Sequence, residues 1–477
     1  MKASRKWILC SLIVVTILVF GFAGRYLWRL AQIGAAYKAK VLCSGVFVSK
    51  RDPDSILNND LLVDDLSIFR HLDTAVDYNS QSVRASFMGL AHRKAIYRPG
   101  LGCTLLIDIS EKQLRSQTYP RQIAPASDRQ YQLWPGGKRT QMAKLPPEVD
   151  SEKLNGVIDK AFSEPDPHRL RRTRAVVVIY DGRIIAERYA PGFSQDTPLL
   201  GWSMTKSVMN ALIGILVRQG KLSPQDKALV PAWCAPGDSR GKITIDQLLR
   251  MTSGLKFAED YTNPRKDVIY MLLGTGDMSA FAMNKPLEAE PGSKWYYSSG
   301  TTNIIARILR DAIGGSDADY LAFPNRELFD RIGMHSAIIE PDAAGIFVGS
   351  SFMYATARDW GRFGLFCLQD GVWNGERILP EGWMQYTLTP TRESPNDEYG
   401  AHFWLKIPPS FYGGVDQISS LPADTYFALG HEGQAITIIP SRKVVVVRLG
   451  LTRLPGAWNQ ELFAVQILDA IESEKSD

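Results

Sequence analysis

Apolar residues recur with two different periods along this chain, and each period predicts a type of element. Over residues 203–220 they recur at helical spacing without a proline, and the final glycine is typical of a helix end. Before it, apolar runs at 176–180 and 184–188 are joined by Asp181-Gly182, a pair typical of tight β-hairpins. The pattern therefore predicts a hairpin followed by a long helix.

Similar patterns continue to the end of the chain. Strands are predicted at 426–429, 435–439 and 444–449. Helices are predicted within 243–255, where Thr244 is the capping residue, and at 267–273, 302–313, 357–370 and 458–471. Helices and strands do not alternate one for one. The order favours an α+β domain over residues 151–477, with an antiparallel β-sheet flanked by helices and a mainly helical subdomain.

Residues 35–150 have weaker periodicity and predict an N-terminal extension and linker. Strands are expected at 41–48 and 104–109 and a helix at 60–72, while 113–147, rich in Gln, Arg, Pro and Gly, suggests an extended connection. No chemical motif is found there. We expect this segment to link the N-terminus to the main domain or to cover part of its surface.

Residues 1–34 predict a membrane segment. An uncharged apolar run at 7–23 follows Lys2, Arg5 and Lys6 and precedes aromatic and basic residues typical of an interfacial anchor. This favours an uncleaved N-terminal helix in the membrane with the bulk of the chain exported, for a bacterium on the periplasmic face of the inner membrane. The alternative is a cleaved signal peptide ending near Ala23, which would leave a secreted or periplasmic protein.

Composition and charge narrow the possible partners. The 477 residues are 45% hydrophobic and 22% charged, which is ordinary for a globular protein with a large core. A net charge of +5 is small for this length, and the basic cluster at 169–174 only precedes an apolar strand. A role in nucleic-acid binding is therefore disfavoured.

Cysteine and histidine usage predicts a disulfide but no metal site. Cys43 and Cys103 flank a coherent segment and form the natural disulfide pair of an exported protein. Cys234 and Cys367 are interpreted as buried thiols. No Cys-x-x-C motif or His-x-x-x-His pair is present, so we expect no metal and no cofactor.

The first candidate for chemistry is Ser203-Met204-Thr205-Lys206, which opens the predicted helix. Residues three apart lie on one helix face, so Lys206 would stand one turn from the hydroxyl of Ser203. Burial disfavours the charge of a lysine, and a neutral Lys206 would accept the proton that a serine nucleophile must lose. Alone, the motif is short enough to be a capping serine followed by an unrelated lysine.

Two later motifs add to it. Tyr297 lies in Trp295-Tyr296-Tyr297-Ser298-Ser299-Gly300 before a predicted helix, where a tyrosine can relay protons if cations depress its pKa, or simply pack as a hydrophobic staple. Gly430-His431-Glu432-Gly433-Gln434 leads into a strand, either as a substrate-lining edge or as a tight turn with a solvated His-Glu pair.

Together, and in this order, the three motifs resemble the serine β-lactamase and penicillin-binding-protein superfamily, most closely its class C-related branch of esterases, D-amino-acid peptidases and 6-aminohexanoate-dimer hydrolases. The resemblance spans residues 173–471 and implies a β-lactamase/transpeptidase-like fold. It implies that Ser203 is the nucleophile, Lys206 its proton acceptor and Tyr297 a proton relay. It also implies an oxyanion hole from the backbone N–H groups of Ser203 and Gln434.

Ser299, His431 and Gly433 are the substrate-binding residues that the resemblance implies. Two of them depart from the lactam-processing members, which usually have Asn in place of Ser299 and Lys-Thr-Gly in place of His431-Glu432-Gly433. An imidazole is mostly neutral near pH 7, so a substrate carboxylate would be attracted less. We therefore expect an acyl-enzyme hydrolase for a small ester, amide or peptide rather than a β-lactamase.

Other functions stay open at this stage. A β-lactamase, a penicillin-binding carboxypeptidase and a non-catalytic binding or sensor module would all share these motifs. An α/β-hydrolase is disfavoured, because Gly201-Trp202-Ser203-Met204-Thr205 lacks the last glycine of Gly-x-Ser-x-Gly and leaves Lys206 unexplained. Neither the exact substrate nor the oligomeric state follows from the sequence.

Overall fold

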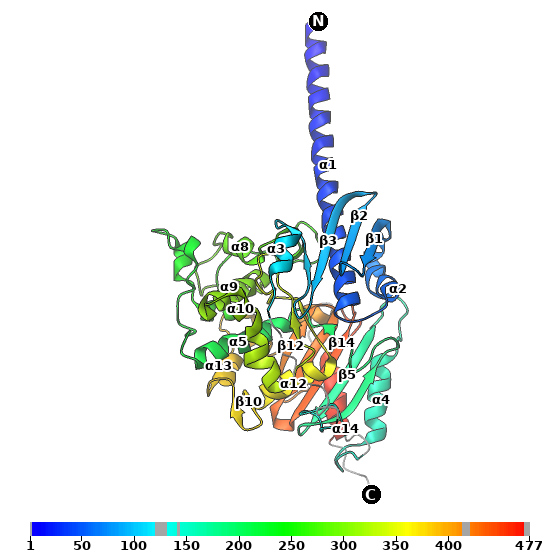
Figure 1. Cartoon of the computed structure of the whole chain (residues 1–477), viewed down its shortest axis with the longest axis vertical. Helices are drawn as coiled ribbons and strands as arrows, with labels where there is room; N and C mark the ends of the chain where they lie inside the picture. Colours follow the sequence, from blue (N-terminus) through cyan, green and yellow to red (C-terminus); the bar gives the residue numbers. More distant parts are fainter. Residues whose placement is uncertain (1, 120–130, 141–143, 413–419, 472–477) are drawn as a thin grey trace.

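A five-stranded antiparallel sheet organises the computed structural model, which describes residues 2–119, 131–140, 144–412 and 420–471 (Figure 1). Its strands lie in the order β12-β13-β14-β5-β6. They are β5 (Thr173–Tyr180), β6 (Arg183–Tyr189), β12 (Tyr426–Gly430), β13 (Gln434–Ile439) and β14 (Val444–Gly450). The predicted hairpin and the three predicted C-terminal strands are confirmed.

Helices cover both faces of this sheet. On one face α4 (Ser151–Phe162) and α14 (Gln460–Ile471) pack against Val176 and Val178. On the other, α5 (Met204–Arg218) and α12 (Ala357–Leu368) lie in the same core as Val177 and Ile179. A sheet that is buried on both faces has nearly continuous apolar strands, which is why β5 and β14 read so clearly in the sequence.

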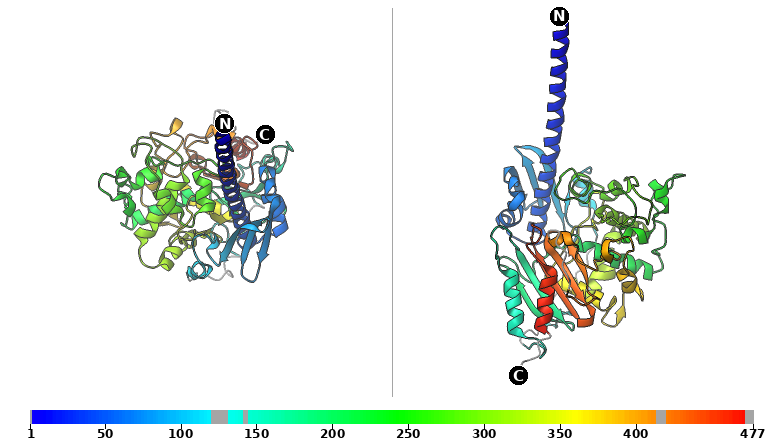
Figure 2. Two further views of the ribbon diagram at one scale, coloured as in Figure 1. Left: turned by 90° about the horizontal axis from the view of Figure 1, so that it is seen from above. Right: turned by 180° about the vertical axis from the view of Figure 1, so that it is seen from behind.

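Between β6 and β12 the chain is mainly helical (Figure 2). The predicted helices at 267–273, 302–313 and 357–370 are confirmed with small shifts in their ends. Within 243–255 the predicted cap Thr244 is confirmed, but the helix ends at Leu249, before the glycine at 254. The helices of this part not yet named are α6 (Ile245–Leu249), α7 (Asp267–Gly274), α8 (Met278–Met283), α9 (Ser299–Ile313), α10 (Asp317–Pro324), α11 (Asp330–Ile332) and α13 (Trp383–Leu388). Its short strands are β7 (Leu199–Leu200), β8 (Ile338–Ile339), β9 (Met353–Ala355), β10 (Val372–Trp373) and β11 (Glu376–Arg377).

The N-terminal extension is more ordered than the sequence predicted. Its long helix α1 (Lys2–Phe47) packs on a four-stranded antiparallel sheet. The smaller elements are α2 (Pro53–Ile56), β1 (Leu72–Asp77), β2 (Ser82–Phe87), β3 (Leu90–Arg98), β4 (Gly102–Leu105) and α3 (Glu111–Ser116). Part of the predicted extended connection at 113–147 lies outside the described residues.

Two expectations for this extension were wrong. Of the strand predicted at 41–48, residues 41–47 instead continue helix α1, because one face of that helix, which includes Ala35, Ala36 and Ala39, is buried and the helix packs on the small sheet. Residues 60–72 form no α-helix but a π-turn and the 3₁₀ segment Asp64–His71. Strands β1, β2 and β3 were not predicted, because their half-exposed positions carry few apolar residues.

Buried contacts attach this extension to the main domain. Glu340, beside β8, is fully buried and pairs with Lys40 of α1. Its carboxylate also accepts hydrogen bonds from the Ser44 hydroxyl (2.8 Å) and the Cys103 backbone N–H (2.6 Å). Next to it a disulfide joins Cys43 to Cys103, with the Cα atoms 6.1 Å apart.

The thiols of Cys234 and Cys367 differ in exposure. Cys367 is buried in α12, as predicted. Cys234 is exposed, so its prediction as a buried thiol was wrong. The apolar neighbour Trp233 is fully buried and suggested a buried pair, but consecutive residues of the short 3₁₀ turn at Pro231–Trp233 point in different directions.

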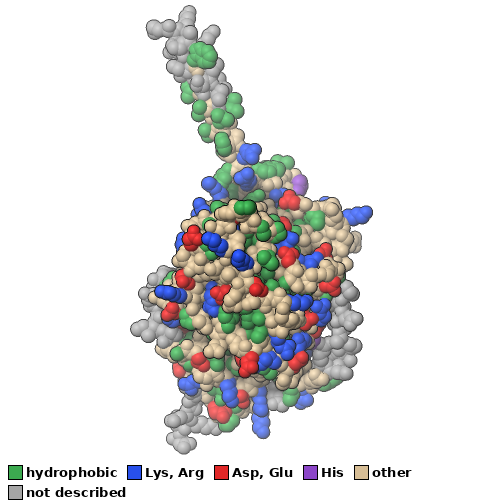
Figure 3. Space-filling model, turned by 90° about the vertical axis from the view of Figure 1, so that its left-hand side faces the viewer, with side chains coloured by type: hydrophobic (Ala, Val, Ile, Leu, Met, Phe, Trp, Pro, Cys, Tyr) green, Lys and Arg blue, Asp and Glu red, His purple; other side chains and the backbone are tan. Residues whose placement is uncertain are grey.

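The first half of α1 projects away from the rest of the molecule and carries exposed apolar side chains, among them Phe20, Phe22 and Trp28 (Figures 1 and 3). Within the part of the chain that the structure describes, no helix combines the length and the apolarity that a membrane crossing requires. The predicted membrane-spanning segment at 7–23 is therefore not supported. The helix does not end with the apolar run but continues through Arg25, Arg29 and Lys38 to Phe47.

Candidate active site

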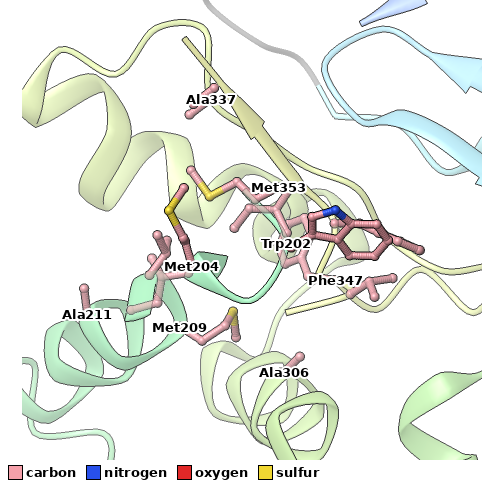
Figure 4. Close-up of a cluster of buried hydrophobic side chains, with 14 of the residues drawn as sticks. Trp202, Met204, Met209, Ala211, Ala306, Ala337, Phe347 and Met353 are labelled. Atoms are coloured by element: carbon pink, nitrogen blue, oxygen red, sulfur yellow. The ribbon is translucent and has the colours of Figure 1, made fainter. Parts of the chain in front are cut away.

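Ser203 lies at the N-terminal end of α5, where a tight turn presents its half-buried hydroxyl. Trp202 before it has a left-handed backbone (φ 49°), and the Gly201 N–H bonds the Met353 carbonyl at 2.9 Å. Figure 4 shows Trp202, Met204 and Met209 in one buried cluster with Met353 and residues of neighbouring segments. The first turn of α5 is thus held by packing on its apolar side.

Lys206 reaches the Ser203 hydroxyl from one helical turn below. Its ammonium nitrogen lies 2.9 Å from Ser203 Oγ, 3.1 Å from Ser299 Oγ and 3.0 Å from the Ser350 carbonyl oxygen. The side chain is only 1% exposed. Burial lowers the pKa of Lys206 to about 8, and the negative charge of Glu259 partly opposes that shift. The neutral amine is therefore accessible near neutral pH.

Ser299 does not line the surface that a substrate would reach. It is fully buried, its hydroxyl accepts from Lys206 and donates to Glu259 Oε1 at 2.5 Å, and its N–H donates to Glu259 Oε2 at 2.7 Å. The predicted substrate-binding role of Ser299 is therefore corrected. A hydroxyl is too short to project from this position, and it bridges Lys206 to Glu259 instead.

Tyr297 stands beside Lys206. Lys206 Nζ lies 4.7 Å from the centre of the phenol ring. The ring of Tyr297 also belongs to an aromatic cluster: its centroid lies 5.2 Å from that of Trp404, on which it stacks, and 5.8 Å from that of Tyr399. Burial raises the pKa of Tyr297, and its interaction with Ser203 only partly opposes this. A phenolate created by nearby cations is thus not supported, and Tyr297 can serve as a neutral proton donor.

The tight turn between β12 and β13 consists of His431, Glu432 and Gly433. Its His-Glu pair is not solvated, in contrast to one of the two interpretations of the sequence. Glu432 has a left-handed backbone (φ 63°) and a buried carboxylate, which accepts from Trp202 Nε1 at 3.0 Å and pairs with Arg453 at 2.6 Å. The half-buried ring of His431 stacks on Tyr261 at 4.6 Å. Burial lowers the pKa of His431, outweighing the attraction of Glu432, so the imidazole is neutral at pH 7.

The strand register places Gln434 away from the cleft. Phe427 of β12 exchanges both backbone hydrogen bonds with Trp404, so alternate residues of β12 bond β13, and Gly430 pairs with Gln434 in that ladder. The Gln434 side chain is held by Gly450 through bonds of 2.7 and 2.9 Å. The predicted oxyanion role of Gln434 is corrected, since its N–H points to β12.

By the same alternation, the N–H of His431 lies on the side of β12 that faces away from β13, the side on which the backbone groups of Phe427 bond Trp404. Glycine is required at the neighbouring position, because a Cβ on Gly430 would lie 2.2 Å from the Gly201 carbonyl oxygen. This close approach brings the turn against the loop of Ser203. The backbone N–H groups of Ser203 and His431 make no hydrogen bond with another described residue.

Gly433 also lies behind the turn. Its carbonyl oxygen accepts from Arg448 Nη1 at 2.8 Å, and a Cβ at this position would lie 2.6 Å from the same nitrogen. Arg448 is fully buried, so this contact faces the end of the sheet. The predicted substrate-binding role of Gly433 is corrected accordingly.

Sequence patterns missed two titratable residues that contact the Lys206 network. Glu259 lies in an irregular loop with no motif around it, half-buried, and burial raises its pKa. His402 is buried, with Nδ1 3.0 Å from the Lys206 carbonyl oxygen, and burial lowers its pKa to about 3, so it is a neutral support. No local signal identifies either residue, because only the fold brings them to α5.

The arrangement is suited to nucleophilic catalysis by a serine. It holds a hydroxyl, a buried amine as its base, a neutral phenol and two backbone donors at the end of a helix and at a strand edge. Among the residues that the structure describes, no three His, Cys, Asp or Glu side chains are grouped so that they could hold a metal ion.

Comparisons with known proteins agree with this geometry. The chain is 25% identical over 293 residues to a 6-aminohexanoate-dimer hydrolase of Paenarthrobacter ureafaciens, covering 58% of this chain and 72% of that protein.

Solved structures show the same fold. A penicillin-binding-protein homologue of Caulobacter crescentus matches with a TM-score of 0.52 at 17% identity, over 68% of this chain and 97% of that one. The hydrolase EstCE1, which has promiscuous acyltransferase activity, matches with a TM-score of 0.50 at 16% identity, over 68% and 98%. The Beta-lactamase family model matches residues 158–457, well over half of the chain, and the protein therefore belongs to the Beta-lactamase family.

Proposed function

We propose that the protein is a serine hydrolase that cleaves a small, uncharged ester or amide through an acyl-enzyme on Ser203. The observation that carries the proposal is the 2.9 Å contact between Lys206 Nζ and Ser203 Oγ, made by a lysine that is almost fully buried. Burial lowers the pKa of Lys206 to about 8, so the amine is not permanently charged near neutral pH and its neutral form can accept a proton. A capping serine with an unrelated lysine would not need this arrangement.

In acylation, Lys206 takes the proton of Ser203 as Oγ attacks the substrate carbonyl carbon. The negative charge that develops on the carbonyl oxygen is stabilised by the backbone N–H groups of Ser203 and His431. Tyr297 then donates a proton to the leaving alcohol or amine and regains one from Lys206. In deacylation the direction reverses: as a water molecule attacks the acyl carbon, Tyr297 takes a proton from it and passes its own to the neutral Lys206. Lys206 then returns a proton to Ser203 Oγ as the bond to the acyl group breaks.

The preference for uncharged substrates is supported by the surroundings of His431. Its imidazole is neutral at pH 7 because burial lowers its pKa, so the turn offers no fixed cation to a substrate carboxylate. The relative named as a 6-aminohexanoate-dimer hydrolase points to short amides as one class to test. Simple esters and D-amino-acid peptides are the other two.

A fluorophosphonate probe tests the chemistry without knowledge of the substrate. We expect covalent labelling of the folded protein at Ser203 and none in Ser203→Ala. Ser207→Ala is a matched control, because this buried serine lies one turn along α5 and its hydroxyl donates to the His402 carbonyl instead. Absence of labelling in the folded wild type would favour a non-catalytic binding or sensor module.

A substrate panel then tests the class. We expect p-nitrophenyl esters or short amides to be hydrolysed faster than nitrocefin or D-alanyl peptides. Rapid nitrocefin hydrolysis would indicate a β-lactamase, and release of D-alanine a penicillin-binding carboxypeptidase. Both results would retain Ser203 as the nucleophile and change only the substrate.

We also propose that the catalytic domain works in an oxidising compartment outside the cytoplasm. The Cys43–Cys103 disulfide supports this, since such bonds persist in exported proteins. Alkylation of the native, unreduced protein should modify Cys234 and leave Cys43 and Cys103 unmodified. Labelling of all three in protein taken directly from cells would contradict the proposal.

A further inference from the structure

A hydrogen-bonded path leads away from Lys206 on the side opposite the nucleophile. Lys206 Nζ donates to Ser299 Oγ at 3.1 Å, and Ser299 Oγ donates to Glu259 Oε1 at 2.5 Å. Lys206 and Ser299 are almost fully buried, so bulk water does not compete for the hydrogen bond between them, whereas Glu259 at the end of the path is half-buried. The three groups are aligned as donor, relay and acceptor.

The hydrogen bonds of Lys206 indicate which neighbouring group can take a proton from its ammonium group. A protonated amine donates all three hydrogens, here to Ser203 Oγ, Ser299 Oγ and the Ser350 carbonyl oxygen. To act as a base, Lys206 must first transfer one of these hydrogens to an acceptor, and the Ser350 carbonyl oxygen is too weakly basic to be protonated. Of the two hydroxyls, only that of Ser299 is followed by a carboxylate.

We propose that Glu259 receives, through the hydroxyl of Ser299, the proton that Lys206 must release before it can act as a base toward Ser203. This inference rests on the proposed serine-hydrolase function. One hydrogen moves from Lys206 Nζ to Ser299 Oγ while the hydrogen of Ser299 moves to Glu259 Oε1. Lys206 becomes a neutral amine, Glu259 a neutral carboxylic acid, and the total charge of the site is unchanged.

Rotation about the Cε–Nζ bond of Lys206 then turns its lone pair toward Ser203 Oγ. Glu259 is in this account a positioning residue for the proton, since it touches neither the nucleophile nor the acyl group. Its carboxylate stays in place because the Ser299 N–H donates to Oε2 at 2.7 Å and the Tyr261 hydroxyl donates to Oε1 at 3.4 Å.

The alternative is that Glu259 only anchors the start of α9 and balances the charge of Lys206. The two accounts predict opposite pH behaviour in Glu259→Gln. If Glu259 is only a negative charge, its loss lowers the pKa of Lys206, and Ser203 becomes reactive at lower pH. If Glu259 takes the proton, its loss leaves Lys206 protonated below its own pKa, and the reactivity moves to higher pH.

Other groups near the pair do not titrate in the range of interest. Burial raises the pKa values of Tyr261, Tyr297 and Tyr399, which keeps these phenols neutral. Burial lowers those of His402 and His431. The exposed Tyr296 contacts Glu259 only by accepting its backbone N–H at 3.3 Å. The profile between pH 6.5 and 9 therefore reports on Lys206 and Glu259.

The experiment measures the rate of fluorophosphonate labelling of Ser203 from pH 6 to 10 in the full-length protein. We expect the acid limb of Glu259→Gln to move to higher pH, with labelling falling about ten-fold per pH unit below the pKa of Lys206 and rejoining the wild type at high pH. Glu288→Gln, which removes an exposed carboxylate that pairs with Lys294, should leave the profile unchanged.

Ser299→Ala removes the bridging hydroxyl but keeps the carboxylate, and we expect its acid limb to move in the same direction. If Glu259→Gln fails to fold, this second variant decides the matter. An acid limb that moves to lower pH, or stays in place, in the folded variants overturns the relay. Absence of labelling in the wild type at every pH would instead overturn the proposed function on which the relay rests.

Discussion

The two sides of Ser203 are held in place by different means. On the helical side, Lys206, Ser299 and Glu259 are joined by direct hydrogen bonds within the catalytic domain. On the sheet side, the turn His431–Gly433 is fixed by Glu432, whose carboxylate bonds Trp202 and Arg453.

The sheet side also depends on the N-terminal extension. Asp65 and Asp64 of that segment pair with Arg453 and Arg172 of the main domain, and Asp60 pairs with Arg174. The helical side thus controls protons through burial, whereas the sheet side is positioned by ion pairs that reach it from outside the catalytic domain. Substitutions should separate these two contributions.

The largest effect is expected on the helical side. Ser203→Ala should abolish turnover, and Lys206→Met should reduce it by about 10³-fold or more, because neither group can act without the other. The double variant should be little worse than either single one. Thermal unfolding verifies that each protein is folded, and Lys221→Met, at an exposed position beyond the end of α5, is the control. Multiplicative losses would mean that Lys206 acts independently of Ser203.

Removal of the disulfide tests whether the N-terminal extension affects the sheet side of Ser203 alone or also the helical side. Cys43→Ala with Cys103→Ala removes a link between residues 60 positions apart, which the chain-entropy model values at about 4 kcal/mol of unfolding free energy. We expect this loss in denaturant unfolding while the folded protein keeps the pH midpoint of Ser203 labelling. A shifted midpoint would show that the extension also influences Lys206, which would contradict the separation between the helical and the sheet side.

Much of the catalytic domain could be predicted because its elements carry local signals. The strands β5 and β14 are apolar on both faces, and Ser203, Lys206 and Tyr297 stand in short motifs. The strand predicted at 41–48 was wrong, since the β-branched residues in 41–47 are held helical as α1 packs against β2 and β3. Propensity is a weaker determinant than tertiary contact in such a segment.

The errors in the site have a different cause. Gln434 was chosen because it follows His431-Glu432-Gly433, but a turn of three residues reverses the chain and puts the outward N–H on His431. Glu259 could not be found at all, since its loop shares no motif with α5 or α9. Strand register depends on the geometry of the turn as well as on the hydrophobic pattern, and the three-residue turn here was not recognised in the sequence.

Arg453 allows a test of the sheet side, because it pairs with one buried and one exposed acid. Arg453→Met leaves Glu432 uncompensated, with its side chain only 4% exposed, and should cost about 3 kcal/mol of unfolding free energy and loosen the turn. Asp65→Asn removes a partner whose side chain is 72% exposed and should cost no more than about 0.5 kcal/mol. Denaturant unfolding measures both, and equal losses would contradict the importance of Glu432.

The smallest expected effect concerns substrate preference and falls on the sheet side alone. His431→Lys places a cation beside the edge of β12, where the wild type has a ring whose pKa is lowered by burial between Tyr261 and Trp202. A charge-assisted hydrogen bond to a substrate carboxylate is worth about 1.5 kcal/mol or more, so the rate for nitrocefin relative to a neutral p-nitrophenyl ester should rise about ten-fold.

His431→Gln is the matched control for this change, because it removes the ring without adding charge and should leave the ratio near that of the wild type. The backbone N–H of residue 431 is present in all three proteins, so acylation itself should persist. The pH midpoint of labelling should also stay constant, since no group of the Lys206 network is altered. If the wild type hydrolyses nitrocefin faster than any neutral ester, the neutral imidazole does not set the preference, and selectivity must arise from the aromatic cluster of Tyr297, Tyr399 and Trp404.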